Sequence, residues 1–309
     1  MKPAVSVVVL TYNHENFIAQ ALDSIISQER YFPIEVLVND DCSTDNTAEI
    51  VKQYQQKYPD IITAYLQPVN SGAMRSYYNM LKLCRGKYFM DISGDDYWLP
   101  GKMKLQFEYM ENNPEVGMCF GRGKVLRNGK FITSWGAKAG EFFNELLIEY
   151  QIPPLTVCVR KSVLDSYIES IQPEQKDWKM EDLPMALWFS KYSKIHFLNQ
   201  DLGVYRILID SLSRPSEINK RLAFFESSKE VLLFFAGDDK EHIKLVKMAH
   251  ERTKANVYLA FNDLAKFRAH NSRGGIRGVL KNIISYMPGG LFVLRKIIFG
   301  KVFLCDLVQ

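Results

Sequence analysis

Three apolar segments that end in polar clusters decide the fold: VSVVVLTYN at residues 5–13, IEVLVNDDCSTD at residues 34–45 and YFMDISGDDYW at residues 88–98. Each is mostly apolar at successive positions before its polar cluster, which is typical of a parallel strand buried on both faces. Ligands of open parallel sheets bind at the carboxyl ends of the strands. The three segments therefore predict a parallel sheet whose binding site lies where the polar clusters follow the strands.

Strand-like and helix-like segments alternate over the first hundred residues. The expected strands are residues 5–10, 34–38, 61–66 and 88–92, and the expected helices are residues 15–28, 43–57 and 75–84. Ser43 or Thr44 is the expected N-cap of the second helix. This order predicts an α/β fold with helices on both faces of the sheet.

The pattern changes along the rest of the chain. Helices are expected at residues 102–111 and 183–192, strands at 156–160 and 202–207, and a hairpin turn at Asn128-Gly129. Beyond Pro215 only helical patterns remain, at residues 224–235 and 240–270. We therefore expect a catalytic domain over residues 1–215 and a helical extension over residues 216–309, with a boundary near residues 215–220.

Composition places the chain among ordinary globular proteins. Apolar residues make up 47% and charged residues 24% of its 309 residues. Its five cysteines are odd in number and include no Cys-x-x-Cys pair, which argues against a disulfide framework and favours a reducing, cytoplasmic compartment. The N-terminal apolar run is too short for a signal peptide, and no stretch approaches the length of a membrane span.

Adjacent carboxylates at Asp95 and Asp96 are the first candidate for chemistry. They repel one another, so holding both at a strand end calls for a cation. Mg²⁺ or Mn²⁺ bound by a few carboxylates and by substrate phosphates would fit, and it would neutralise a departing diphosphate. The alternative is a solvated acidic turn, which their position after an apolar strand makes less favourable.

Three further positions carry both a functional and a structural interpretation. Asp41 could accept hydrogen bonds from a base or ribose, or could belong to a helix start. Arg75 could pair with diphosphate oxygens, or could be a surface arginine. Glu181-Asp182 could supply a general base, or could favour a helix N-terminus through the dipole.

Other enzyme classes lack their signatures here. The sequence contains no Gly-x-Gly-x-x-Gly, no P-loop and no Gly-x-Ser-x-Gly motif, and its five histidines show no metal-ligand spacing. A sugar nucleotidyltransferase would need a Gly-rich basic loop after the first strand, which TYNHEN at residues 11–16 is not. A catalytically inactive scaffold protein that binds nucleotide sugars is the alternative of another class, and the acidic residues at 95, 96 and 182 argue against it.

Together these clusters resemble the family 2 glycosyltransferases, which have the GT-A fold. The resemblance covers residues 3–215. It rests on five ordered motifs: VSVVVLTYNHENFIAQALDSIISQ, IEVLVNDDCSTDNTAEIV, NSGAMRSYYNMLKLCRGKYFMDISGDDYW, KMEDLPMALWFSKYSKIHFLNQDLGVYR and the SLS that follows. The resemblance implies an inverting enzyme that moves a sugar from a nucleotide-sugar donor, with UDP favoured, to a carbohydrate or lipid-linked acceptor.

The family's roles can be placed on matching residues. The resemblance implies that Asp96 binds the metal directly, that Asp95 lies nearer ribose or sugar and shares the metal, and that Asp182 is the catalytic base. It also implies a set of donor and acceptor contacts: Thr11 and Asp41 at the nucleoside, Tyr12, Asn13 and Glu15 lining that pocket, Arg75 near the phosphates, and Trp98 on the acceptor side.

Three positions depart from the family pattern. Many relatives have an acidic residue where this chain has Ser93, and many have a histidine two residues after the Tyr-Arg motif, where Ile207 and Leu208 stand here. The metal is therefore expected to be held less completely, or with help from a neighbour. Cys42 replaces a common glycine.

The charge distribution sets the C-terminal region apart. The net charge is −3 over residues 1–215 and +7 over residues 216–309, and residues 264–305 contain eight Lys/Arg and no Asp/Glu. Apolar residues 276, 279, 280, 283, 284 and 287 fall on one face of an expected helix, and residues 291–304 are very apolar. A cationic amphipathic helix of this kind favours contact with a membrane surface. A helix packed on the catalytic domain, or a dimer contact, is the alternative, and nucleic-acid binding is not expected.

Overall fold

The computed structural model describes residues 2–137, 142–208, 215–273, 276–287 and 293–294. Two compact units make up the chain: residues 1–142 with 151–206, and residues 143–150 with 207–309. The domain boundary expected near residues 215–220 stays a prediction. The Ser-Leu-Ser motif at residues 211–213 and most of the apolar stretch 291–304 lie outside the described residues.

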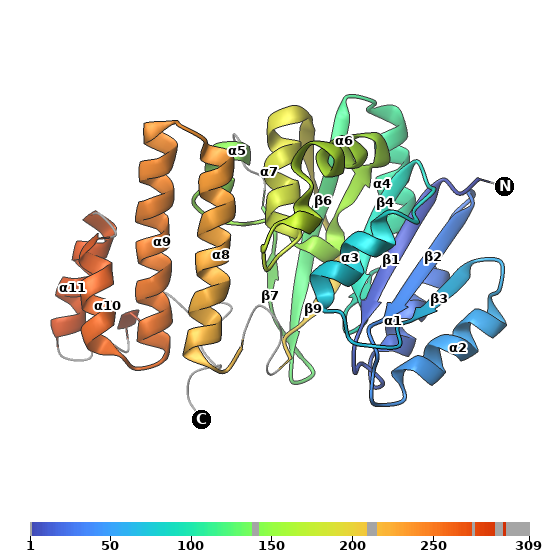
Figure 1. The fold of residues 1–309 in the computed structure, drawn as a ribbon, viewed down its shortest axis with the longest axis horizontal. Coiled ribbons are helices and arrows are strands. Elements are labelled where there is room, and N and C mark those ends of the chain that lie inside the picture. The colour runs from blue at the N-terminus through green and yellow to red at the C-terminus, as the bar shows by residue number, and fades with distance from the viewer. Residues whose placement is uncertain (1, 138–141, 209–214, 274–275, 288–292, 295–309) are drawn as a thin grey trace. The chain divides into compact units, whose positions relative to one another are not determined.

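One mixed sheet forms the centre of the first unit (Figure 1), with strands in the order β3-β2-β1-β4-β8-β6-β9-β5 and with β7 paired to β6. Its strands are β1 (Val5–Thr11), β2 (Ile34–Asp40), β3 (Ile62–Leu66), β4 (Tyr88–Ser93), β5 (Tyr97–Trp98), β6 (Val116–Arg127), β7 (Lys130–Trp135), β8 (Cys158–Arg160) and β9 (Lys194–Arg206). β1 lies parallel to β2 and β4, and β2 lies parallel to β3. The predicted α/β fold with a parallel N-terminal sheet is confirmed.

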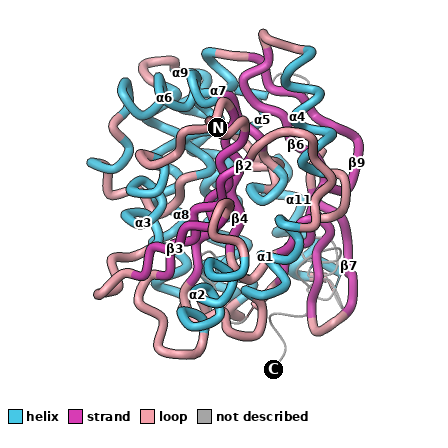
Figure 2. Tube along the Cα trace, turned by 90° about the vertical axis from the view of Figure 1, so that its right-hand side faces the viewer, coloured by secondary structure: helices cyan, strands magenta, loops and turns pink. Residues whose placement is uncertain are grey.

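Helices cover both faces of this sheet. They are α1 (Ile18–Ile26), α2 (Thr47–Lys57), α3 (Ala73–Leu81), α4 (Lys102–Asn112), α6 (Lys161–Ile171) and α7 (Asp182–Tyr192), with short 3₁₀ turns at Pro154–Thr156 and Pro173–Gln175. Figure 2 shows α3 and α6 on one side of the strands and α1 and α4 on the other. Val7, Val8 and Val9 of β1 are fully buried between these layers, as a double-sided parallel strand requires.

The two faces of β4 carry different chemistry. Tyr88, Met90 and Ile92 belong to the main core with β1 and with α1 and α4. On the opposite face Phe89 meets the Tyr77 ring of α3, with centroids 6.2 Å apart. Asp91 follows Phe89 by two residues and therefore projects to that second face.

The expected N-cap of the second helix is wrong. α2 begins at Thr47 and not at residue 44, because Ser43 and Thr44 bond elsewhere. Ser43 Oγ donates to Asp40 Oδ1, and Thr44 N donates to Asn13 Oδ1 at 2.8 Å. These residues therefore join two loops rather than start a helix.

The strands β6 and β9 in the C-terminal half of the sheet are longer than those predicted from the sequence. The hairpin at Asn128-Gly129 is confirmed, with both residues at positive φ (47° and 74°) between β6 and β7. Long β6, however, pairs in parallel with β9, which begins at Lys194 instead of the expected residue 202. This pairing joins segments about seventy residues apart, which local patterns do not reveal.

The second unit is helical, with α8 (Ile218–Ala236), α9 (Lys240–Ala260), α10 (Leu264–Arg273), α11 (Ile276–Tyr286) and most of α5 (Phe142–Leu146). The single helix expected over residues 240–270 is wrong, because the chain breaks at Asn262, whose φ is +61°. Within the described residues, no helix combines the length and the apolar character needed to cross a bilayer.

Glu226 of α8 contacts two side chains of α9, His250 and Lys254, and one of its own helix, Lys229. Its carboxylate lies 2.6 Å from Lys254 Nζ, 3.0 Å from His250 Nε2 and 3.2 Å from Lys229 Nζ. Burial opposes the charged form, but hydrogen bonds from Lys254 and His250 lower the pKa of Glu226 from its ordinary 4.5 to about 2. The carboxylate therefore contributes stability as long as it is ionised.

We expect Glu226→Gln to lower the unfolding free energy at pH 7 by about 1 kcal/mol, after allowance for solvent screening of this partly exposed group. Because the folded pKa is depressed, the loss should be complete above about pH 4.5 and should shrink as the pH falls toward 2. Urea unfolding at pH 7 and pH 3 measures it. Glu217→Gln, which breaks an exposed pair with Lys220, is the control; an equal effect of Glu226→Gln at both pH values would contradict the assignment.

Candidate active site

The ends of three strands meet at one edge of the sheet. Thr11 of β1 lies beside Asp40 of β2, and Leu10 lies beside Ser93 of β4. Main-chain bonds continue past the strand ends, from Asp41 N to Thr11 O (3.0 Å) and from Gly94 N to Leu10 O (2.7 Å). The structure therefore brings the residues around Thr11, Asp41 and Asp95 together from three separate parts of the sequence.

Asp41 holds the loop that leads into α3. Its Oδ1 accepts from Ser71 N (2.8 Å) and Ser71 Oγ (3.1 Å), and its Oδ2 accepts from Gly72 N (2.8 Å). Gly72 has a φ of +84°, a conformation that favours glycine. The loop ends at α3, whose first turn carries Arg75 exposed to solvent. A contact between Asp41 and a nucleoside stays a prediction, and in this structure its oxygens order the loop that places Arg75.

The loop after β1 is tied to the loop after β2. The ties are Asn13 N to Ser43 Oγ (2.9 Å), Thr44 N to Asn13 Oδ1 (2.8 Å), His14 N to Thr47 Oγ1 (2.8 Å), Glu15 N to Asp45 Oδ2 (3.1 Å) and Asn46 N to Glu15 Oε2 (3.0 Å). The predicted site residues Asn13 and Glu15 thus use their side chains to fix loop shape. Thr11 is buried, whereas Tyr12 is 43% exposed, and the predicted contact of either residue with a nucleoside stays a prediction.

Asp95 and Asp96 lie in the turn between β4 and β5, and Arg206 at the end of β9 holds that turn. Arg206 N donates to Asp96 Oδ1 at 2.7 Å, and the guanidinium donates to the main-chain oxygen of Asp95 and to Gln20. The guanidinium also lies over the Tyr97 ring, 4.7 Å from its centroid. Burial, and then the neighbouring Asp95, raise the pKa of Asp96 well above its ordinary value. The turn therefore opposes a negative charge on Asp96, and a bound cation would favour its ionised form.

Gly94 allows the acidic turn to pack against the first loop. A Cβ at this position would lie 2.7 Å from Thr11 Oγ1 and 3.0 Å from His14 Nδ1. Thr11 Oγ1 and His14 Nδ1 are themselves 3.2 Å apart. Burial lowers the pKa of His14, while Asp95 acts in the opposite direction. His14 thus belongs to the surroundings of the acidic turn, although the sequence motifs did not single it out.

The donor set fits a divalent cation that a substrate completes. Asp95 Oδ1 is buried and has no hydrogen-bond partner in the structure, which is unusual for a carboxylate oxygen. In the part of the chain that the structure describes, no three His, Cys, Asp or Glu side chains form a complete metal site. Mg²⁺ and related ions are commonly held by one or two carboxylates plus substrate phosphates. Asp95 and Asp96 would supply the protein's share of such a site, and their role as metal ligands stays a prediction.

A second group of carboxyls surrounds the start of α7. Asp182 is the first residue of that helix, and its Oδ1 accepts from Leu183 N at 2.8 Å. Burial, then Asp182 and Asp91, raise the pKa of Glu181 to about 8. Burial likewise raises the pKa of Asp91 to about 7, with Asp182 adding to the effect. The structure therefore places Asp182 beside the β4 strand that ends in the acidic turn, within a group whose other carboxyls are partly protonated at neutral pH.

The expectation that Trp98 lines the acceptor side needs correction. Trp98 is only 2% exposed, and its indole Nε1 donates to Leu155 O at 2.9 Å. Lys102 Nζ lies 4.0 Å from the ring centroid in the same core, where burial lowers the pKa of Lys102 to about 8. Trp98 therefore supports the acidic turn from within the core instead of contacting a ligand.

Sequence reasoning missed three residues of this region: Arg206, Asp91 and His14. Arg206 stands in the Tyr-Arg motif, so its position was visible, but its hydrogen bond to Asp96 joins residues 110 apart in sequence. Asp91 interrupts an apolar strand, which is a local signal for a functional carboxyl. His14 gives no signal of its own in a single sequence.

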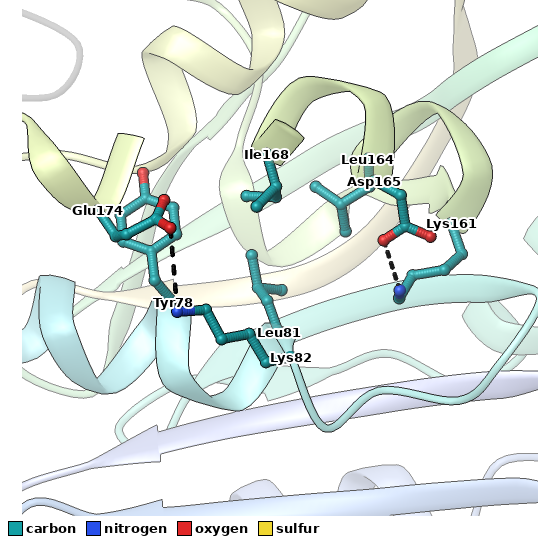
Figure 3. Close-up of a pocket in the computed structure, with 8 residues that line it drawn as sticks. All are labelled: Tyr78, Leu81, Lys82, Lys161, Leu164, Asp165, Ile168 and Glu174. Carbon is teal, nitrogen blue, oxygen red and sulfur yellow. Dashed lines mark hydrogen bonds and ion pairs between the residues drawn. The ribbon is translucent and has the colours of Figure 1, made fainter. Parts of the chain in front are cut away.

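A small cavity lies away from this edge of the sheet. Its volume is about 200 Å³, and Figure 3 shows it between α3 and α6, with Leu164 and Ile168 among its apolar walls. Lys82 and Glu174 form an ion pair of 3.9 Å at its rim. None of the predicted donor, metal or base residues lines it.

Solved structures share the fold. S. aureus TarS (residues 1–349) in complex with UDP-GlcNAc matches with a TM-score of 0.62 at 19% identity, over 95% of this chain and 84% of that one. The mannosyltransferase PcManGT from Pyrobaculum calidifontis, in complex with GDP-Man and Mn²⁺, matches with a TM-score of 0.56 at 16% identity, over 97% of this chain and 88% of that one. The mixed sheet and its flanking helices thus have the GT-A fold.

Sequence comparison assigns the family. The model of glycosyl transferase family 2 matches residues 6–160, so the chain belongs to that family. The putative teichuronic acid biosynthesis glycosyltransferase TuaG of Bacillus subtilis is 28% identical over 220 residues, which cover 69% of this chain and 82% of TuaG. An uncharacterised protein of Mycobacterium bovis is 36% identical over 138 residues, but the match covers 44% of this chain and only 38% of that protein.

Gly94 tests whether the acidic turn must pack against the Thr11 loop. We expect Gly94→Ala to weaken binding of UDP in the presence of Mn²⁺ about tenfold, because overpacking typically costs about 1–3 kcal/mol and about 1.4 kcal/mol is tenfold in affinity. Isothermal titration calorimetry measures it. Gly123→Ala, whose Cβ would meet nothing closer than 3.3 Å, is the control. Unchanged affinity in Gly94→Ala would show that the contact does not shape the site.

Proposed function

We propose that this family 2 enzyme is an inverting, metal-dependent glycosyltransferase that moves a sugar from a nucleotide-diphosphate sugar to an acceptor hydroxyl. The observation that carries the proposal is the buried, unpartnered Oδ1 of Asp95 in a turn shared with Asp96. This turn lies at the same sheet edge as the loops of Thr11 and Asp41. A diphosphate and a cation would together satisfy the charges collected there.

The donor is proposed to lie along that edge. Tyr12, Thr11 and Asp41 would face the nucleoside, and Arg75 at the start of α3 would pair with diphosphate oxygens. We favour a UDP-sugar, since TarS is described with UDP-GlcNAc. A GDP-sugar is the alternative, since PcManGT, which has the same fold, is described with GDP-Man. A divalent ion bound at Asp95 and Asp96 supplies charge neutralisation for the leaving diphosphate.

Asp182 is proposed as the general base of a single in-line displacement. The acceptor oxygen forms a bond to the anomeric carbon while the bond from that carbon to the diphosphate oxygen breaks, and the acceptor proton passes to Asp182. Glu181, with a pKa of about 8, is mostly protonated at neutral pH. Its neutral state limits repulsion within the group around Asp182.

The acceptor is proposed to be a growing polysaccharide or a lipid-linked oligosaccharide, as in the biosynthesis for which TuaG is named. Such an acceptor places the enzyme at a membrane surface, and we propose a peripheral location on its cytoplasmic side. The basic C-terminal segment, with eight Lys/Arg and no Asp/Glu over residues 264–305, supports this location.

We expect Asp182→Asn to lower the transfer rate by about 10²–10⁴-fold, the usual contribution of a general base, while metal-dependent donor binding is kept. Single-turnover assays and calorimetry separate the two effects. Asp177→Asn, at an exposed position nearby, is the matched control. Transfer at the normal rate in Asp182→Asn would remove Asp182 from this role.

Metal dependence has its own test. Chelation with EDTA should abolish donor binding and Mn²⁺ should restore it. Asp95→Asn and Asp96→Asn should each raise the Mn²⁺ dissociation constant by about 100-fold, because loss of an outer-shell partner already costs about 10–100-fold. Asp60→Asn, on an exposed loop, is the control, and Mn²⁺ binding monitored by electron paramagnetic resonance is the measurement. Full donor binding in EDTA would refute the metal assignment.

A further inference from the structure

The polar side of α11 faces its own unit, whereas an ordinary surface helix turns its apolar side to the core. Its contacts with α10 are polar: Asn282 Nδ2 donates to Arg268 O at 2.9 Å, and Asn271 Nδ2 donates to Asn282 Oδ1 at 3.0 Å. Ser285 is buried on the same side, and Arg268 Nε donates to Ser285 Oγ at 3.2 Å. From Leu280 onward, where the structure describes its side chains, the inward side of α11 is therefore hydrophilic apart from Ile284, which packs on the helical core.

The apolar side of α11 is exposed. Leu280, Ile283 and Met287 follow one another at helical spacing and are 55%, 56% and 58% exposed. Tyr286 beside them is 70% exposed. We call Leu280, Ile283, Tyr286 and Met287 the α11 apolar face. A soluble helix normally turns such a stripe to the core, and a clustered apolar face in contact with water marks an interaction surface.

Cations border this face. The Arg268 guanidinium lies 4.0 Å from the Tyr286 ring centroid, so a positive charge and an aromatic ring meet at the edge of the apolar side. Lys266 and Arg273 of α10 have side chains that are 61% and 69% exposed, and each also pairs with a carboxylate: Lys266 Nζ lies 3.1 Å from Asp263, and Arg273 Nη1 lies 4.0 Å from Glu251. Residues 264–305 of the sequence contain eight Lys/Arg and no Asp/Glu, so positive charge is in excess over this segment. An apolar stripe beside an excess of positive charge matches the boundary of an anionic bilayer, with acyl chains beneath a layer of phosphates.

We propose that the α11 apolar face inserts into the surface of an anionic lipid bilayer, with Lys266, Arg268 and Arg273 against the headgroup phosphates. A second copy of the chain fits less well, since pairing two such faces would bring together two segments that each carry an excess of positive charge. The inference rests on the proposed work at a membrane surface and names the residues that make the contact. It does not depend on the donor, the metal or the base.

The test uses the full chain and sedimentation with vesicles of phosphatidylglycerol and phosphatidylcholine, compared with vesicles of phosphatidylcholine alone. We expect partitioning onto the anionic vesicles to be at least about tenfold stronger and to fall with salt. Ile283→Asp with Met287→Asp should weaken it about tenfold or more. Val69→Asp with Ile132→Asp, at exposed apolar positions of the first unit, changes the net charge equally and should retain most of the binding.

Two further measurements keep the outcome clear. Circular dichroism and the melting temperature show whether each variant is folded, and transfer to a soluble acceptor should be the same in Ile283→Asp/Met287→Asp as in the unmodified chain. The proposal is overturned if both double variants bind the vesicles equally, or if the unmodified chain shows no preference for anionic vesicles. It is also overturned if the unmodified chain associates with itself and only Ile283→Asp/Met287→Asp abolishes that association. Normal transfer without vesicle binding would defeat this inference alone, whereas vesicle binding without transfer would defeat only the proposed function.

Discussion

The parallel register of β1 with β2 and with β4 is the constraint from which the site follows. It sets Thr11 beside Asp40 and Leu10 beside Ser93, so the residues just beyond these strands must share one small region. Valines that are buried on both faces of β1 fix this register, because a shift would place polar strand ends in the core. The carboxyls of the site are thus brought together by hydrophobic packing, against their mutual repulsion.

Hydrogen bonds from main-chain donors and from one arginine reduce the repulsion between these carboxyls. Asp41 accepts from Ser71 and Gly72, and Asp96 accepts from the main chain of Arg206. These bonds leave the Oδ1 atom of Asp95 without a partner and leave Asp96 with a raised pKa. A site held in this state is less stable alone than with a cation and a diphosphate, and such local instability is common where binding provides the missing interactions.

The sequence predicts the parts of the structure that depend on local pattern. The strands of residues 5–11 and 88–93 are apolar on consecutive positions, and the Asn128-Gly129 turn needs residues that accept positive φ, so both could be recognised. The β6–β9 pairing could not, because both strands mix polar with apolar residues and meet across a long separation. The burial of Trp98 was equally hidden, since an aromatic residue beside an acidic motif looks the same whether it faces a ligand or the core.

In the helical unit, too, the sequence pattern leaves one feature of the structure undetermined: the direction in which the apolar side of α11 points. A helical wheel places residues 276, 279, 280, 283, 284 and 287 on one face, but it does not state whether that face points inward or outward. In the structure Ile284 packs on the helical core, whereas Leu280, Ile283 and Met287 are exposed. Apolar burial, at about 25 cal/mol per Å², favours the inward choice. The hydrogen bonds of Asn282 with Asn271 and with Arg268 O favour the opposite one, because turning the helix over would leave the buried Asn271 amide without its Asn282 partner at a cost of about 1–3 kcal/mol. The polar pair therefore sets the direction of the helix, and the apolar side is left for a partner outside the chain.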